Sequence, residues 1–201
     1  MRRSAGLVFE THSLTVDNER GIATGWLGGT LSLRGRELAG ELGARRRADG
    51  IQAVHASDLA RAVETVEIAF EGSGIPIELD WRLREIDYGE LNGAPVAVLE
   101  RERALRIDRR FPGGESYRDT VARVADFLEG VSSDERILVI GHTATRWALD
   151  HLLDGEELES VVTQPFDWRP SLRAEYVSRR YVLSTPPSTT MFLRLGRPSP
   201  S

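Results

Sequence analysis

The stretch ILVIGH at residues 137–142 decides the fold class of this chain. Four consecutive apolar residues before Gly-His are typical of a central strand in a parallel sheet, because such a strand is buried on both faces and does not alternate. Shorter apolar runs at residues 7–10, 51–56 and 76–79 predict three further strands. The sequence therefore predicts a sheet built largely from parallel strands.

Helical patterns of apolar residues stand between these strands, at residues 34–47, 58–70, 117–130 and 143–153. Ser57 is expected to be the N-cap of the second helix. The alternation of strands and helices predicts an α/β fold, a three-layer sandwich with a mostly parallel central sheet. Residues 13–32 and 81–117 are expected to be irregular, and residues 165–176 to hold a late strand. We expect one domain over residues 1–183, followed by a Ser/Thr/Pro-rich tail at 184–201.

The composition excludes several kinds of chemistry. All 26 basic residues are arginine, so neither a P-loop lysine nor a Schiff-base lysine exists, and the absence of cysteine removes thiol chemistry. A formal net charge of −5 argues against a nucleic-acid partner. Without a signal peptide or an apolar run of membrane-spanning length, the expected location is the cytoplasm, away from the membrane.

Polar residues with catalytic potential follow the predicted strands. In open α/β sheets, ligands bind beyond the carboxyl ends of the strands. His12 follows the first strand, Arg61 lies in the first turn after the second, and His142 and Thr143 follow the ILVIGH strand. Imidazoles, a guanidinium and helix N-termini suit a phosphate group. Since a neutral imidazole can attack phosphorus, a carboxyl group is then needed for the leaving alkoxide, and Glu85 is the candidate.

Several blocks, in this order, resemble the histidine phosphatase superfamily, also called the phosphoglycerate-mutase-like family. The resemblance covers roughly residues 6–165. The blocks are the strand with His12 and Asn18 six residues apart, GW at 25–26, LSLRG at 31–35, SDLARAVET at 57–65, LREIDYG at 83–89 with NG at 92–93, FPGGES at 111–116, and VIGH at 139–142.

This resemblance implies a role for each matched residue. His12 would be the nucleophile that becomes phosphorylated, and Glu85 the general acid that later activates water. Arg61 and His142 would hold the phosphate oxygens, and Asn18 would contact the same phosphate. The implied activity is that of a metal-independent phosphatase for phosphomonoesters, with no cofactor and with a small phosphorylated metabolite as its partner.

Two positions depart from the family pattern. Thr11 stands where the family has arginine before the nucleophile, and Ser13 stands where it has glycine. A charged hydrogen bond contributes roughly 1.5–3 kcal/mol, so its loss would slow the reaction about 10- to 150-fold. The hydroxyls of Thr11 and Ser13 are expected to donate to phosphate. Arg146, four residues after His142, is a candidate replacement for the missing guanidinium.

The connection over residues 92–115, here called the cover segment, is expected to lie over the phosphate pocket. Its short length favours a phosphatase over a mutase. Its arginines could attract a second acidic group on the substrate; they are Arg101, Arg103, Arg106, Arg109 and Arg110. Three alternatives remain: a catalytically weakened module that binds a phospho-ligand or a protein, a mutase-type phosphotransferase, and a metallohydrolase. The last is disfavoured because no His-x-x-x-His or His-Glu-x-x-His pair occurs.

Overall fold

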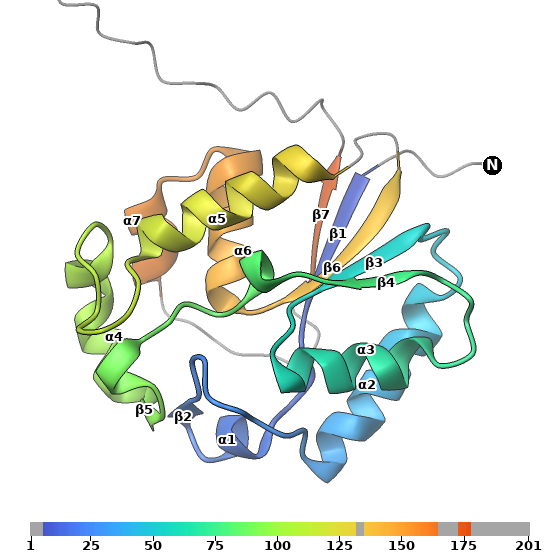
Figure 1. The fold of residues 1–201 in the computed structure, drawn as a ribbon, viewed down its shortest axis with the longest axis horizontal. Coiled ribbons are helices and arrows are strands. Elements are labelled where there is room, and N and C mark those ends of the chain that lie inside the picture. The colour runs from blue at the N-terminus through green and yellow to red at the C-terminus, as the bar shows by residue number, and fades with distance from the viewer. Residues whose placement is uncertain (1–5, 132–134, 165–172, 178–201) are drawn as a thin grey trace, which may run out of the picture.

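A five-stranded sheet forms the centre of the computed structural model, which describes residues 6–131, 135–164 and 173–177 (Figure 1). The strands are β1 (Gly6–Thr11), β3 (Ala53–Ala56), β4 (Ile77–Leu79), β6 (Arg136–Gly141) and β7 (Arg173–Val177). Their order is β4-β3-β6-β1-β7, and every neighbouring pair is parallel except β1 with β7. The mostly parallel sheet predicted from the apolar runs is therefore confirmed.

Helices cover both faces of this sheet (Figure 1). One face carries α2 (Leu33–Arg46) and α3 (Ala60–Phe70), which pack against each other. The opposite face carries α5 (Tyr117–Gly130) and α6 (Thr143–Leu149), with α7 (Leu158–Thr163) packed beside α6. Two helical layers with a sheet between them are the three-layer arrangement that the sequence predicts.

Two apolar cores explain why the ILVIGH stretch does not alternate. Leu138 packs with Val66 of α3 on one face of the sheet. Val139, the next residue, packs with Phe127 of α5 on the other face. Successive side chains of a strand point to opposite faces, so both must be apolar when helices cover both. Ile137 to Ile140 are each at most 1% exposed.

The start of α3 differs from the prediction. The helix begins at Ala60 rather than at Asp58, and its N-cap position is Leu59, which makes no side-chain capping bond. The hydroxyl of Ser57 instead accepts the backbone N–H of Leu59 at 3.2 Å, within the turn before the helix. Ser57 is therefore not the N-cap. This tight turn still places Arg61 in the first turn of α3.

The helix predicted over residues 143–153 is present, but its hydrogen-bond pattern changes after Leu149. The α-helical part ends at Leu149, and a π turn continues it over Asp150–Asp154 to Gly155, whose φ is 76°. By contrast, α5 has the predicted bounds. Its start is fixed by a capping box in which Ser116 and Asp119 satisfy each other's backbone N–H groups.

The two regions expected to be irregular contain short elements. These are α1 (Val16–Glu19), β2 (Ile22–Ala23), β5 (Ala94–Pro95), α4 (Val96–Glu102) and 3-10 turns at Trp81–Leu83, Gly89–Leu91 and Arg103–Arg106. Strand β2 pairs with β5 in a second, two-stranded sheet, which joins the two regions to each other. Elements of two to seven residues are too short to show a clear periodicity, so the sequence pattern did not reveal them.

The base of the cover segment is held together by backbone hydrogen bonds. The N–H of Glu115 donates to the carbonyl of Asp87 at 2.9 Å, and the N–H of Glu90 donates to the carbonyl of Pro112 at 3.0 Å. Gly114 lies in this contact, where a Cβ would stand 2.3 Å from the carbonyl oxygen of Asp87. Only glycine permits the two chains to approach so closely.

The tail predicted at residues 184–201 lies outside the described residues, as does the end of the predicted domain at 178–183. Of the late strand expected within residues 165–176, the described part is β7, which runs antiparallel to β1. None of the helices in the described ranges combines the length and apolarity that crossing a membrane requires.

Candidate active site

Strand register brings two imidazole rings together at the edge of the sheet. In the parallel β1–β6 pair, Thr11 lies opposite Gly141. The next residues are His12 and His142, and the N–H of His12 donates to the carbonyl of Gly141 at 3.0 Å. The two ring centroids are 4.9 Å apart. The two histidines that the sequence places after strands therefore lie side by side in the structure.

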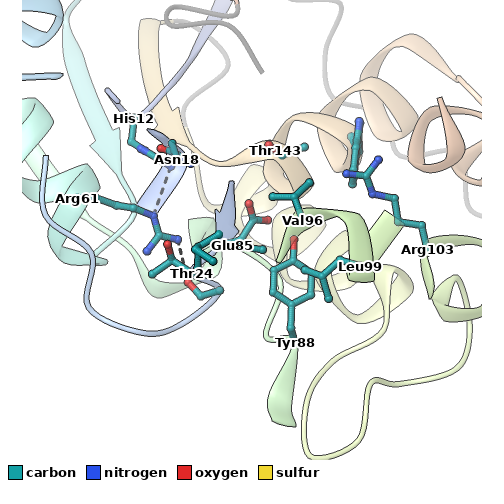
Figure 2. A pocket seen from close by; sticks show the side chains of 14 residues that line it. His12, Asn18, Thr24, Arg61, Glu85, Tyr88, Val96, Leu99, Arg103 and Thr143 are labelled. Carbon is teal, nitrogen blue, oxygen red and sulfur yellow. Dashed lines mark hydrogen bonds between the residues drawn. The ribbon is translucent and has the colours of Figure 1, made fainter. Parts of the chain in front are cut away.

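The His12 ring has one nitrogen fixed and one directed at the site. Nδ1 donates to the carbonyl of Ser13 at 2.7 Å, and since a carbonyl only accepts, Nδ1 carries the hydrogen. Nε2 therefore has a lone pair, and Nε of Arg61 lies 3.3 Å from it (Figure 2). Burial and the charge of Arg61 lower the pKa of His12 to about 3, which keeps the ring neutral at ordinary pH.

Arg61 is held beside both rings by a loop. Its guanidinium donates to the carbonyls of Gly25 at 2.8 Å and Leu27 at 3.3 Å. It also lies 3.3 Å from Nδ1 of His142, which must accept because a guanidinium has only donors. The side chain of an early helical residue leans toward the helix N-terminus, and this brings Arg61 to the carboxyl ends of the strands.

The loop that orients Arg61 is tied to the block that contains Glu85. Oδ1 of Asn92 accepts the backbone N–H groups of Trp26 at 3.3 Å and Tyr88 at 3.0 Å. Gly25 has a φ of 57°, and a Cβ there would stand 1.8 Å from this same oxygen. The Gly-Trp and Asn-Gly pairs of the sequence are therefore two sides of one contact.

Glu85 is a buried carboxyl group that faces the same cavity. Its Oε1 accepts the N–H of Ile86 at 3.0 Å and of Ala144, at the start of α6, at 3.1 Å. Burial raises the pKa of Glu85, and these two hydrogen bonds and the charge of Arg61 only partly oppose it. A raised pKa favours the protonated form, which a general acid requires.

Arg123 and Trp26 hold the backbone of Glu85 from the other side. The guanidinium of Arg123 donates to the carbonyls of Arg82 at 2.6 Å, Arg84 at 2.8 Å and Glu85 at 3.0 Å. The indole N–H of Trp26 donates to the same Glu85 carbonyl at 2.6 Å. Sequence reasoning missed both residues. The only signal for Trp26 was its place in the quoted Gly-Trp block, and Arg123 had none.

A single cavity connects the predicted residues to the cover segment (Figure 2). Predicted residues that line it are His12, Asn18, Arg61, Glu85 and Thr143. Arg103, one of the cover-segment arginines expected to attract a second acidic group, also lines it. Side chains that were not predicted line the rest, and these include Ile22, Tyr88, Val96, Leu99 and Trp147. His142 is fully buried behind Arg61 and does not line the cavity in this structure.

Asn18 is oriented by the capping box of α1. Its Oδ1 accepts both the N–H of Thr15 at 3.1 Å and the Thr15 hydroxyl at 2.8 Å. Its amide nitrogen has no hydrogen-bond partner among the described residues. The donor of this side chain is therefore the group that a ligand in the cavity can use.

Besides His142, three predicted residues do not line the cavity. The hydroxyl of Ser13 donates to the carbonyl of Gly35 at 2.6 Å, because α2 passes directly behind it. The hydroxyl of Thr11 is buried and has no partner within the described part of the chain. Nε of Arg146 donates to both carboxylate oxygens of Asp150 at 2.7 Å, one helical turn away. In this arrangement the Thr11 and Ser13 hydroxyls, expected to donate to phosphate, and the Arg146 guanidinium, expected to replace the missing arginine, therefore do not reach the cavity.

Within the described ranges, no group of three or more histidine, aspartate or glutamate side chains is placed to hold a metal ion.

Comparison with known proteins agrees with this geometry. A family model described as the histidine phosphatase superfamily, branch 1, matches residues 7–167. The chain is 31% identical over 174 residues to the 2,3-bisphosphoglycerate-dependent phosphoglycerate mutase of Afipia carboxidovorans, over 78% of this chain and 84% of that protein. The corresponding Methylobacterium radiotolerans protein is 34% identical over 171 residues, covering 74% and 79%.

Solved structures with a similar fold include phosphatases. A mycobacterial glucosyl-3-phosphoglycerate phosphatase aligns with a TM-score of 0.73 and 23% identity, over 86% of this chain and 90% of that chain. The alpha-ribazole phosphatase from Shigella flexneri aligns with a TM-score of 0.67 and 24% identity, over 78% and 83%. These similarities establish the fold. The relatives are named both as mutases and as phosphatases.

Proposed function

The chain belongs to the histidine phosphatase superfamily, and we propose that it is a metal-independent phosphatase that hydrolyses phosphomonoesters through a phosphohistidine at His12. The observation that carries this proposal is the state of the His12 ring. Its Nδ1–H is bonded to the Ser13 carbonyl, so Nε2 carries the lone pair at the wall of the cavity, where it accepts Nε–H of Arg61 at 3.3 Å until a phosphoryl group takes that place. A neutral, oriented imidazole next to a guanidinium is what attack on a phosphoryl group needs.

The reaction proceeds in two displacements. In the first, Nε2 of His12 forms a bond to phosphorus, the bond from phosphorus to the ester oxygen breaks, and protonated Glu85 gives its proton to the departing alkoxide. In the second, the Glu85 carboxylate takes a proton from water as that water attacks the phosphohistidine. Inorganic phosphate leaves, His12 is neutral again and Glu85 is protonated again. Arg61 stabilises the charge on the transferring oxygens throughout.

The choice of a phosphatase over a mutase rests on the cover segment. It is short, and its base is closed by the hydrogen bonds between residues 87–90 and 112–115. A mutase must retain its phosphorylated form until a second substrate arrives, which requires a cover that excludes water. We therefore infer that, under this short cover segment, water reaches the phosphohistidine and hydrolyses it.

One observation favours a second candidate, a catalytically weakened module that binds a phospho-ligand. Ser13 and Arg146 are engaged elsewhere, and Thr11 does not line the cavity. Arg61 is therefore the one guanidinium at the His12 end of the cavity among the described residues. On this alternative, the cavity binds phosphate without turning it over at a useful rate.

The test compares three proteins in EDTA: the natural chain, His12→Ala and His151→Ala. His151 is a matched control because its ring bonds the Glu156 carbonyl outside the cavity. With p-nitrophenyl phosphate and an alkyl phosphate, the natural chain and His151→Ala should turn over, whereas His12→Ala should lose essentially all activity. A radiolabelled phosphoenzyme that survives alkali and is lost in acid should form only when His12 is present.

Three other results would overturn the proposal. Equal, negligible rates in all three proteins would favour the binding module. Turnover abolished by EDTA and restored by zinc would favour a metallohydrolase. Transfer of the labelled phosphate to a phosphoglycerate acceptor faster than to water would favour a mutase.

A further inference from the structure

Arg103 lies at the opposite end of the cavity from the nucleophile. It comes from the 3-10 turn of the cover segment, is 9% exposed, and lines the cavity. Figure 2 shows its guanidinium across the cavity from His12 and Arg61, with Glu85 and Val96 between. The guanidinium packs over the ring of Trp147, 5.1 Å from the ring centroid. The side chain is therefore fixed in place at this end of the cavity.

This buried guanidinium has no carboxylate partner among the described residues. Its sequence neighbour Glu102 is paired with Arg106 at 2.5 Å. Arg110, also of the cover segment, is paired with Asp119 at 2.9 Å. An arginine remains charged at any ordinary pH, and a buried charge without an opposite charge is costly. The unpaired position of Arg103 in a ligand cavity therefore indicates that its counter-ion comes from the ligand.

The space between the two cationic ends is lined largely by carbon. Ile22, Val96 and Leu99 contribute aliphatic surface, and Tyr88 contributes a buried ring. Glu85 is the one acidic group in the described lining, and Figure 2 shows it between Arg61 and Arg103. A ligand that matches this lining has a phosphate at one end, a carbon body, and a second negative charge at the other end.

We propose that Arg103 is a specificity-determining residue that binds a second anionic group, a carboxylate or a phosphate, on the alcohol part of the substrate. The inference rests on the proposed phosphatase function and names the substrate class for it. Trp147 covers one face of the guanidinium, so the N–H groups at its edge are the ones available to a ligand. Two parallel hydrogen bonds from that edge match the oxygens of a carboxylate or phosphate.

The test uses matched sets of phosphate esters. Esters of a three-carbon and of a six-carbon alcohol end in a methyl group, a carboxylate or a second phosphate. For the natural chain, kcat/KM should be about 10- to 150-fold higher for one of the anionic esters than for the methyl ester, the range that a charged hydrogen bond supplies. Whether the carboxylate or the second phosphate is preferred identifies the natural group.

Arg103→Gln should remove this preference while it changes kcat/KM for the methyl ester less than about threefold. Arg103→Met is the second variant, because it keeps an apolar chain over Trp147 if the first variant unfolds. Arg101→Gln is the control, since it removes the same charge from an exposed position of the cover segment outside the cavity lining. A preference that persists in folded Arg103 variants, or that is absent from the natural chain, overturns the inference.

Failure of the proposed function is distinguishable from failure of this inference. If no ester is hydrolysed, the proposed function fails, and the same esters are compared as ligands by calorimetry. The inference then requires the anionic ester to bind about tenfold or more tightly than the methyl ester, and Arg103→Gln to abolish the difference. Equal binding of all three esters overturns it.

Discussion

The indole N–H of Trp26 donates to the backbone carbonyl of Glu85 at 2.6 Å, although 59 positions separate the two residues. The carbonyls on either side of Trp26, those of Gly25 and Leu27, accept from the guanidinium of Arg61. One short loop therefore holds both the cation at the phosphate end of the cavity and the backbone of the acid. This coupling predicts that a change at Trp26 affects proton transfer.

Trp26→Phe removes this donor and keeps an aromatic ring. We expect kcat for an alkyl phosphate to fall about 2- to 12-fold, the value of one neutral hydrogen bond, with a smaller loss for p-nitrophenyl phosphate. The reason is that nitrophenolate leaves with little help from an acid. Steady-state kinetics on both substrates check this, and Trp81→Phe, which changes an exposed tryptophan, is the control. Equal losses on both substrates would argue for a general structural defect instead.

The dependence of kcat/KM on pH should report the pKa values of His12 and Glu85. Activity needs neutral His12, whose pKa is lowered to about 3, and protonated Glu85, whose pKa burial raises. As pH rises, kcat/KM should therefore increase through about 3 and then fall through the raised pKa of Glu85, with the optimum between these two pKa values. Glu85→Gln should lower kcat for an alkyl phosphate about 10²- to 10⁴-fold and remove the alkaline fall. An unchanged alkaline fall in that variant would assign it to another group.

Phosphate affinity should depend on Arg61 and not on Arg146. Arg61 lies beside Nε2 of His12, whereas Arg146 is bonded to Asp150 outside the cavity lining. Arg61→Gln should weaken inhibition by inorganic phosphate about tenfold or more, the loss of a charged hydrogen bond. Arg146→Ala should leave the inhibition constant within about twofold. A large increase in the constant for Arg146→Ala would restore its role as a replacement guanidinium.

Arg123 should be important for stability. It is 6% exposed and bonds three backbone carbonyls together with the carboxylate of Glu115, at 3.0 Å. Arg123→Met removes this donor from the carbonyls of Arg82 and Arg84 and removes the cation that pairs with partly buried Glu115, so we expect about 3–5 kcal/mol less free energy of unfolding in urea. Arg118→Met, which breaks an exposed pair with Asp108, should cost less than about 1 kcal/mol. Similar losses in the two variants would contradict this assignment.

Thr11→Val tests whether the hydroxyl of the last residue of β1 contacts the substrate. This hydroxyl is buried without a partner in the described ranges, so the nearly isosteric valine should raise the free energy of unfolding by about 1 kcal/mol. KM should stay within about twofold. Thr145→Val is the matched comparison, because the Thr145 hydroxyl donates to the Leu83 carbonyl at 3.0 Å. Its loss should lower the free energy of unfolding by about 1–3 kcal/mol. A several-fold rise in KM for Thr11→Val would mean that the hydroxyl does bind phosphate.

Local and periodic signals were enough to predict much of the fold and part of the candidate site. The apolar periodicity of residues 117–130 predicted α5 with its bounds, and the strand ends predicted that His12 and Arg61 lie at one cavity. These predictions succeed because each depends on residues near in sequence or on the general geometry of parallel sheets. Glu85 follows no strand and came from the irregular region and the family resemblance.

The failures have the opposite cause. Arg146 had an equally good partner one turn away in Asp150, and helix geometry alone cannot choose between a ligand and a carboxylate. Ser13 lost its hydroxyl to Gly35, 22 positions away. The role of Arg123 depends on Glu85, 38 positions away. Contacts of this kind follow from tertiary packing, which no periodic pattern encodes.

The hydrogen bonds that join residues 87–90 to residues 112–115 have a consequence for engineering. They hold the two ends of the cover segment next to each other, so the residues between these ends form an almost closed loop on a fixed base. A cover of different length, taken from another family member and grafted beyond Asn92 so that the Asn92 bonds to Trp26 and Tyr88 remain, should stand on this base without altering His12 or Arg61. Substrate selectivity could then be changed by replacing this segment alone, while His12 keeps its place at the end of β1.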